Sequence, residues 1–345
     1  MSTQFDEIFD GMSETRRPRR KKPKRGRKVL AALGVLVLLV IAGLGGFVWF
    51  LGNRFDDRAN HLTDEQVFDG PRPDAGDGPM NVLLLGADEP MDQIDFTDSR
   101  GLRSDTIMIA HIPSDRASMQ LMSIPRDSWV SIDGHGEAKI NAALSYGGLP
   151  LAVKTVGDFI DAPIHHVAVI DFEGFKMLTD ALGGVDVESP EAFTGKDNHT
   201  FVKGVNHLDG EAALAFVRER YAFSDGDLQR GRNQQAFLGA LFDKIASAGT
   251  LSNPAKISSM VTDFAPYMYV DEKLTSGKIG GIGFSMRDVR GDDITYFTAP
   301  ISGAGTSSSG QQYLRVDEAE LQKVRDAFDN DTVKEYAATA EEQNL

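Results

Sequence analysis

Short apolar runs alternate with longer stretches of helical period after residue 80. Runs of about six aliphatic and β-branched residues predict buried strands, whereas apolar residues three or four apart indicate one face of a helix. This interleaving predicts an α/β fold in which helices cover both faces of one mixed central sheet. The expected strands are Asn81–Gly86, Thr106–Ile112, Ser118–Ile124, His166–Ile170, Gly184–Val187 and Ile294–Ala299, and the expected helices are Asn141–Tyr146, Leu151–Phe159, Phe172–Leu182, Gly210–Arg218, Leu228–Ala248, Pro254–Phe264 and Asp317–Phe328.

The longest apolar segment precedes this region. Val29–Leu51 holds 23 residues without a charge, and a helix of that length crosses a hydrocarbon core of about 30 Å. The alternative is a cleaved signal peptide, whose apolar stretch would be only ~7–15 residues long and would end in a small-residue cleavage motif. The pattern therefore predicts one transmembrane helix over residues 29–51.

Charge is distributed unevenly about this predicted span. Residues 1–28 contain ten Lys or Arg and four acidic residues, a net charge of +6, so a chain of net charge −15 carries −21 after the span. Basic flanks stay on the cytoplasmic side of a membrane, so we expect residues 1–28 to form a cytoplasmic basic tail and the rest to lie outside. The tail lacks room for a helix-turn-helix, and no nucleic-acid partner is expected.

The remainder divides into three parts by composition. Residues 52–80 are polar and turn-rich, which predicts an extracytoplasmic stalk, and residues 331–345 are polar and acidic, which predicts a frayed tail. The folded domain is expected over residues 81–330. The chain has no cysteine, which excludes disulfides, thiol catalysis and zinc–thiolate sites.

Two carboxylates flank neighbouring strand predictions. Asp88 follows the first strand in LLLGAD, and Asp105 precedes the second in RSDT, after Arg103. The two aspartates could meet at one site although 16 residues separate them. Paired carboxylates suit Mg²⁺, which takes oxygen ligands and shares its coordination shell with substrate phosphates. Either aspartate alone could equally be an ordinary surface-loop residue.

Basic residues gather at the ends of other elements. In SIPRD, Pro125 ends a strand and directs Arg126 and Asp127 outward, and Lys139 follows in KINAA. Further along, Arg218 and Arg220 are two apart in FVRERY, and Arg230 and Gln234 are four apart on one helical face of DLQRGRNQQ. Converging arginines bind phosphate oxygens through their planar forks. The alternative for each arginine is a surface ion pair with a nearby acid, namely Glu211, Glu219 or Asp227.

The histidine pair His165-His166 could suggest a metal site. Because adjacent residues of a strand point to opposite faces, a structural role is the better interpretation.

These motifs together resemble one known family. LLLGAD, RSDT, SIPRD, KINAA, FEGFKMLTDALGGVDV, LDGEAALAFVRER and DLQRGRNQQ are similar, in this order, to the LytR-CpsA-Psr family of cell-wall glycopolymer ligases. The resemblance extends from about Asn81 to Lys244, and the predicted N-terminal span also fits. Two departures are the long acidic loop between Asp88 and Asp105 and the lack of a further C-terminal domain that some relatives carry.

The resemblance implies a three-layer α/β/α domain of the bacterial cell envelope. Such a domain transfers a phosphoglycosyl polymer from a polyprenyl-pyrophosphate carrier to peptidoglycan and releases polyprenyl phosphate. It implies that Mg²⁺ is held by Asp88 and Asp105, that Arg103 and Asp127 lie in the same site, and that the pyrophosphate is bound by Arg126, Lys139, Arg218, Arg220, Arg230 and Gln234. Any general base would be a carboxylate such as Asp88 or Asp127. Two other functions stay open, a hydrolase that uses water as acceptor and a membrane-tethered regulator without catalysis.

Overall fold

The computed structural model describes residues 45–87, 104–223, 226–247, 249 and 253–343. It separates into one unit over residues 1–50 and a second over residues 51–345, and the account below concerns the second. Residues 29–44 of the predicted span at residues 29–51 lie outside the described residues. Within the described part of the chain, no helix has both the length and the apolar character needed to cross a membrane.

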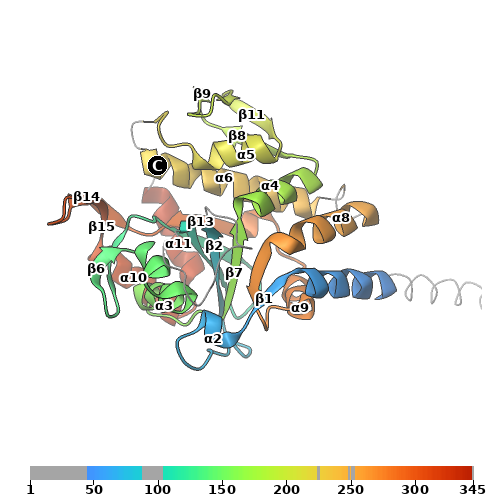
Figure 1. Cartoon of the computed structure of the whole chain (residues 1–345), viewed down its shortest axis with the longest axis horizontal. Coiled ribbons are helices and arrows are strands. Elements are labelled where there is room, and N and C mark those ends of the chain that lie inside the picture. The colour runs from blue at the N-terminus through green and yellow to red at the C-terminus, as the bar shows by residue number, and fades with distance from the viewer. Residues whose placement is uncertain (1–44, 88–103, 224–225, 248, 250–252, 344–345) are drawn as a thin grey trace, which may run out of the picture. The chain divides into compact units, whose positions relative to one another are not determined.

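A mixed sheet of seven strands forms the centre of the second unit, as the sequence predicted (Figure 1). In this sheet β7 and β2 are parallel, β2, β3 and β4 are successively antiparallel, and β13 is parallel to β4. At the other edge, β12 runs antiparallel to β7 and parallel to β1. The strands in spatial order are β1 (Asn60–Leu62), β12 (Met268–Asp271), β7 (His166–Asp171), β2 (Met80–Ala87), β3 (Ser104–Ile112), β4 (Met119–Ile124) and β13 (Ile294–Thr298).

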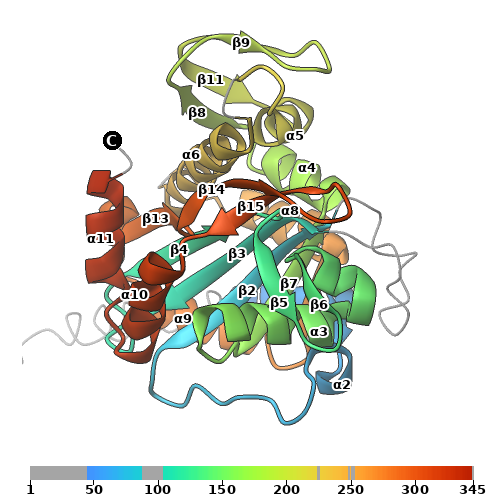
Figure 2. The same cartoon turned by 90° about the vertical axis from the view of Figure 1, so that its left-hand side faces the viewer.

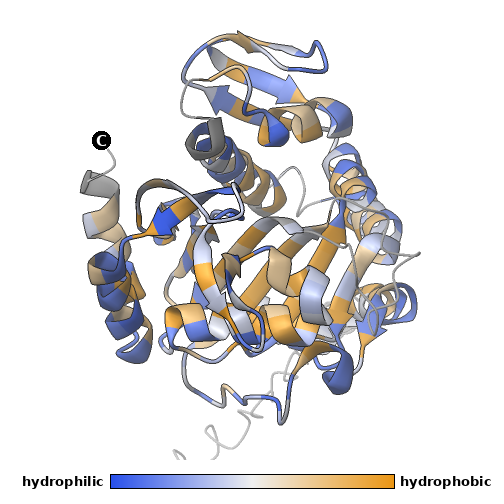
Figure 3. Ribbon diagram, turned by 60° about the vertical axis from the view of Figure 1, so that its left-hand side comes forward, coloured by the Kyte–Doolittle hydropathy of each residue, from blue (hydrophilic) through white to orange (hydrophobic). Residues whose placement is uncertain are grey.

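Alternating side chains of these strands build a core on each face of the sheet. Leu83 and Leu85 of β2 pack on one face against the core that includes α3 (Ala142–Ile160), α10 (Glu318–Asp329) and α11 (Val333–Gln343). Val82 and Leu84 pack on the other face with α6 (Gly226–Ala246) and α9 (Ser276–Ser285). This period of two is what a strand buried on both faces requires. Figure 2 shows α3 and α6 on opposite sides of the sheet, and Figure 3 shows the apolar residues concentrated in its strands.

A second lobe, residues 172–246, has a core of its own (top of Figure 1). Here α4 (Phe172–Ala181), α5 (Gly210–Arg218) and α6 pack with the hairpin of β8 (Val185–Ser189) and β11 (Gly204–Leu208). Between these two strands lies the short pair β9 (Phe193–Thr194) and β10 (Thr200–Phe201). Phe193, Phe201 and Phe216 contact one another with ring centroids 4.8–5.8 Å apart, which ties the β9–β10 hairpin to α5.

The remaining elements are short or lie at the periphery. Gly147 and Gly148 depart from helical geometry within the range of α3, so two helical stretches meet at a break there, in agreement with the two helices predicted over Asn141–Tyr146 and Leu151–Phe159. The shorter elements are α2 (Asp64–Val67), β5 (Trp129–Ile132), β6 (Gly136–Lys139), α8 (Pro254–Phe264), η2 (Ala265–Tyr267), η3 (Gly291–Asp293), β14 (Ile301–Thr306) and β15 (Gln312–Val316).

The predictions for the two ends of the domain were wrong. Residues 52–80 are not a stalk, since they supply β1 to the central sheet and bury Val67 and Phe68 in the main core. Residues 331–345 are not a frayed tail, since α11 begins at Val333 and buries Val333 and Ala337 in the same core. Both segments are short and polar on average, so their few buried residues produce no sustained apolar period.

A buried ion cluster fixes the N-terminal segment to the sheet. Arg72 contacts Asp271 through Nη1 and Oδ1 at 2.6 Å and donates from Nη2 to the carbonyl of His165 at 2.6 Å. His166 Nδ1 lies 3.0 Å from Asp271 Oδ2, and Asp271 is fully buried. The structure thus gives His165 and His166 structural partners, in line with the interpretation of this pair.

Candidate functional site

The sheet topology brings the predicted site segments to one edge. Because β2 and β4 run opposite to β3, both end where β3 begins, and β7 and β13 end at the same edge. Ala87, the residue before Asp88, pairs with Ser104, the residue before Asp105. In this register, the residues that precede the two aspartates lie opposite each other on adjacent strands. Asp88 and Arg103 lie outside the described residues, and Asp105 is described only as part of β3.

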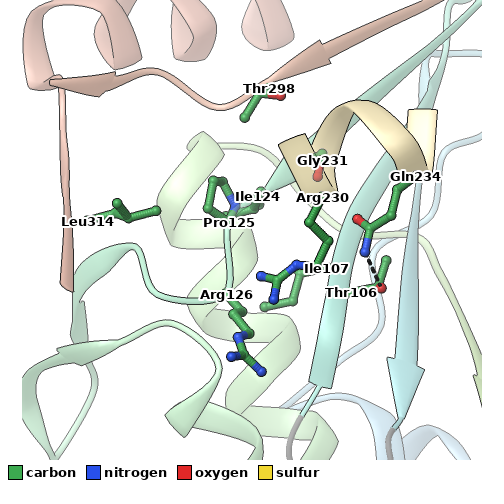
Figure 4. A pocket seen from close by; sticks show the side chains of 11 residues that line it. Thr106, Ile107, Ile124, Pro125, Arg126, Arg230, Gly231, Gln234, Thr298 and Leu314 are labelled. Atoms are coloured by element: carbon green, nitrogen blue, oxygen red, sulfur yellow. Dashed lines mark hydrogen bonds between the residues drawn. The ribbon is translucent and has the colours of Figure 1, made fainter. Parts of the chain in front are cut away.

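A pocket lies at this edge and encloses about 420 Å³, part of it open solvent (Figure 4). It is lined by residues from the start of β3, the end of β4, the first turns of α6, the end of β13 and β15. Figure 4 shows the side chains of Arg126 and Arg230 reaching into the same region, Arg126 from the turn after β4 and Arg230 from α6. The lining residues are Thr106, Ile107, Ser123, Ile124, Pro125, Arg126, Arg230, Gly231, Gln234, Thr298 and Leu314.

Arg126 and Lys139 are held together by Asp127. Asp127 Oδ1 contacts Lys139 Nζ at 2.8 Å, and its Oδ2 lies 3.8 Å from Arg126 Nε. The turn after Pro125 is fixed by the amide of Ser128, which donates to the Pro125 carbonyl at 2.9 Å. The carboxylate of Asp127 therefore lies between Arg126 and Lys139 and can orient both side chains.

The helix α6 contributes the other polar wall of the pocket. Arg230 is 8% exposed, although it is a long charged side chain. One turn further, Gln234 Nε2 donates to Thr106 Oγ1 at 3.3 Å and to the Val217 carbonyl at 3.4 Å (Figure 4). These contacts join α6 to β3 and to the end of α5, so Arg230 and Gln234 lie on one face of the helix as their spacing predicted.

Arg218 and Arg220 have aromatic neighbours. The guanidinium carbon of Arg218 lies 4.2 Å from the ring centroid of Phe172, the first residue of α4. Arg220 lies 4.8 Å from the ring centroid of Tyr221 and donates from Nη2 to the Tyr221 hydroxyl at 2.7 Å. Of the surface partners that the alternative interpretation proposed, Glu211 pairs with Lys176 at 2.9 Å and Glu219 accepts the backbone amide of Arg220, whereas the side chain of Asp227 lies outside the described residues.

Glu219 instead organises the backbone around both arginines. Its Oε1 accepts from the amides of Arg220, Tyr221 and Ala222, and its Oε2 accepts from the amide of Lys196 at 2.8 Å. Burial opposes the charge of this carboxylate, but the four hydrogen bonds outweigh burial and hold the pKa of Glu219 below its usual value. Sequence reasoning treated Glu219 only as a surface partner and missed this role.

Other contributors to the site carry no sequence signal that could have identified them. Thr298 accepts from Gln235 Nε2 at 3.2 Å, and Leu314 is brought to the pocket because its amide donates to the Asp127 carbonyl at 2.9 Å. Over the described residues, no group of three or more His, Cys, Asp or Glu side chains is arranged to hold a metal.

Comparison with known proteins places this chain in one family. Residues 53–330 match the LytR_cpsA_psr family. The chain therefore belongs to the LytR-CpsA-Psr family, as the sequence motifs predicted.

Several relatives make the comparison concrete. The polyisoprenyl-teichoic acid–peptidoglycan teichoic acid transferase TagU of Bacillus cereus is 36% identical over 64% of this chain and 72% of its own length. The protein of that name from Enterococcus faecalis is 30% identical over 89% of this chain and 98% of its own length. The crystal structure of B. subtilis TagV superposes with a TM-score of 0.63 at 28% identity, covering 74% of this chain and 98% of that one.

Proposed function

We propose that this protein is a Mg²⁺-dependent phosphotransferase that moves a glycopolymer from a polyprenyl-pyrophosphate carrier onto peptidoglycan. Membership of a family whose named relatives are teichoic acid transferases supports glycopolymer transfer to peptidoglycan. The polymer would be an anionic or arabinose-rich wall glycan. The observation that carries the phosphate part of the proposal is the convergence of Arg126 and Arg230 on one pocket.

Two arginines that line one partly buried pocket favour the binding of an anion. Like charges repel, and withdrawing them from water adds a desolvation cost that a bound oxyanion offsets. The forked guanidinium group suits two oxygens of a phosphate, and a pyrophosphate offers oxygens to two such groups. Gln234 supplies a neutral donor on the same wall, and Lys139 adds a charge beside Arg126.

The transfer is a displacement at phosphorus. An oxygen of an acceptor sugar hydroxyl forms a bond to the phosphorus next to the glycan, and the bond from that phosphorus to the bridging oxygen breaks. The bridging oxygen keeps the electron pair and leaves as polyprenyl phosphate, while the hydroxyl proton passes to solvent or to a carboxylate. Arg126, Arg218, Arg220 and Arg230 would bind and neutralise the pyrophosphate oxygens, since positioning and charge stabilisation dominate such reactions.

Asp88 and Asp105 are the residues that would hold the metal. The pairing of Ala87 with Ser104 fits this assignment, because it sets the preceding residues of both aspartates side by side. Mg²⁺ bound there would supply positive charge to the phosphate oxygens.

The decisive experiment measures release of polyprenyl phosphate from a lipid-pyrophosphoryl saccharide by the full-length chain in detergent. A ligase requires both Mg²⁺ and a peptidoglycan acceptor and forms a phosphodiester-linked product. A hydrolase releases the lipid phosphate equally without acceptor, and a regulator releases none. Asp105→Ala should abolish turnover with little loss of stability, and near wild-type turnover in this variant and in Asp88→Ala would refute the two-carboxylate site.

The location of the domain is part of the same proposal. The basic residues 1–28 would lie in the cytoplasm, residues 29–51 would span the plasma membrane, and the rest would be extracytoplasmic. Protease added to cell bodies stripped of their wall should then digest the chain after Leu51 and spare the basic tail. Protection of the large domain would refute this orientation.

A further inference from the structure

The outward face of α9 is apolar. Phe284 is 71% exposed and Ile279 is 39% exposed, and Lys278 is the one charged residue in the sequence of this helix. Gly280 and Gly283 lie between the two apolar side chains on the helix surface, and no atom of the described residues is within 4 Å of the position that a Cβ would take at either glycine. Surface helices in water carry charged or polar side chains on their outward face. The face of α9 therefore suits contact with an apolar medium.

The inner side of α9 is fixed to the chain that enters the second unit. Ser276 donates to Asp56 from its amide at 2.7 Å and from its hydroxyl at 2.6 Å. Gly52 permits the approach of the two segments, because a Cβ atom there would lie 2.9 Å from Ser276 Oγ. Ile282 packs in one small core with Phe55. Figure 1 shows α9 next to the blue helix that leads into β1, so α9 lies against the first residues of this unit.

These first residues follow the predicted transmembrane span directly. The proposed location puts residues 29–51 in the plasma membrane, and Asp56 comes only five positions after Leu51. Five helical residues rise about 7.5 Å, and the headgroup layer on each side of a bilayer is about 5–8 Å thick. A helix bonded to Asp56 and adjoining Gly52 is therefore held at the depth of the headgroups.

Basic residues follow the apolar face of α9. The guanidinium carbon of Arg287 lies 4.9 Å from the ring centroid of Phe284, and Arg290 donates from Nη1 to the Arg287 carbonyl at 2.8 Å. Asp288 lies 3.7 Å from Arg287 and offsets part of this charge, so the apolar contact is the main contribution. An aromatic ring beside long basic side chains is typical of helices that lie in the headgroup region, where the cations contact lipid phosphates.

We propose that α9 is a membrane-contact helix, whose Phe284 and Ile279 enter the outer leaflet of the plasma membrane beside the span. The inference rests on the location given in the proposed function and goes beyond it. The second unit is then held at two points, by the span and by α9, and keeps one orientation relative to the bilayer. That orientation presents the pocket to a substrate whose polyprenyl carrier lies in the same leaflet.

Fluorescence quenching in the full-length chain tests this contact. Because the chain has no cysteine, single-cysteine variants can be labelled with nitrobenzoxadiazole, a polarity-sensitive fluorophore. The variants Phe284→Cys, Val205→Cys and Trp49→Cys are reconstituted into vesicles of phosphatidylcholine and phosphatidylglycerol, with or without phospholipids that carry a nitroxide high on the acyl chain. Val205 is the matched control, because it is an apolar residue that is 66% exposed on β11, which Figures 1 and 2 show well away from α9. Trp49 reports on the predicted span.

We expect nitroxide lipids to quench the label at positions 284 and 49 about twofold or more and to leave the label at position 205 almost unchanged. Quenching at position 49 with equal, weak quenching at 284 and 205 overturns the proposal and keeps the span. Quenching at position 284 without quenching at 49 keeps the contact and refutes the span. Absence of quenching at both positions overturns both, whereas the release of polyprenyl phosphate tests the proposed reaction separately.

A further variant tests the side chain itself. Phe284→Asp is made in the Ile279→Cys chain, so that a charge replaces the apolar ring while the label reports from the same face. An aspartate is disfavoured among acyl chains, so quenching of the label at position 279 should fall about twofold or more. Urea unfolding should stay near wild type, because Phe284 is exposed. Undiminished quenching in the folded variant would mean that Phe284 does not hold α9 at the membrane, which also overturns the proposal.

Discussion

Replacement of Glu219 by Gln tests how the site is held in shape. The carboxylate accepts four backbone amides, three on Oε1 and that of Lys196 on Oε2. Glutamine keeps one oxygen for the three amides but turns an NH₂ group toward the amide of Lys196, so a donor meets a donor. Hydrogen bonds to charged groups contribute about 1.5–3 kcal/mol each, so we expect a loss of about 2–3 kcal/mol.

The free energy of unfolding is measured by urea denaturation of Glu219→Gln and of Glu211→Gln. Glu211 is the matched control, because it is an exposed residue of the same segment that forms a surface ion pair with Lys176 at 2.9 Å, and its loss should cost about 1 kcal/mol or less. The pKa of Glu219 is depressed in the folded state, so its contribution is present above the ordinary glutamate value near 4.5 and is lost as the pH falls through the folded value. The difference between wild type and Glu219→Gln should therefore be full at pH 7 and shrink below about pH 4.5.

Equal stability of Glu219→Gln and Glu211→Gln at pH 7 would refute the reasoning. A stability difference that does not shrink in acid would also count against it.

Three further predictions concern single residues. Arg230→Lys keeps the charge but loses the forked donor, so turnover should fall tenfold or more, at about 1.4 kcal/mol of activation free energy per decade. Urea unfolding should stay near wild type. Retained turnover would argue against a phosphate clamp. Burial, and then the charge of His166, lower the pKa of His165 to about 4. The folded state therefore resists protonation of His165, and the free energy of unfolding should fall by up to about 3 kcal/mol as the pH drops from 6.5 to 4. His165→Asn should flatten this pH dependence in urea titrations at several pH values. Arg72→Met leaves Asp271 buried without its arginine and should cost about 3–5 kcal/mol in thermal and urea unfolding; a loss below 1 kcal/mol would mean that the cluster is not structural.

Much of the central sheet could be predicted because its strands are long and apolar. The run from Asn81 to Gly86 and that from Thr106 to Ile112 are within two residues of β2 and β3 at each end. The edge strand β1 and its neighbour β12 were missed, since they hold three and four residues and pair across more than 200 positions of sequence. No local pattern specifies such a pairing, and only the burial of their neighbours makes it favourable.

The site could be predicted in part for a related reason. Strand ends gather at one edge of a sheet, so Arg126 could be expected to meet residues of α6, and the helical spacing of Arg230 and Gln234 put them on one face. The contact of Arg218 with Phe172 and that of Glu219 with Lys196 join separate elements of the second lobe. Such contacts depend on the tertiary packing of α4, α5 and the β9–β10 turn, which composition and period do not encode.

The N-terminal part of the second unit has a mechanical consequence. Asp56 accepts the amide and the hydroxyl of Ser276 at 2.7 and 2.6 Å, Arg58 donates to the Thr262 carbonyl at 3.2 Å, and β1 then continues as a strand of the sheet. Tension applied at Leu51 is therefore shared by α8, α9 and the sheet edge, and it loads several hydrogen bonds in parallel. All of these bonds lie within the second unit, so the segment from Asp56 to Leu62 is held to α8, α9 and the sheet and does not act as a separate tether.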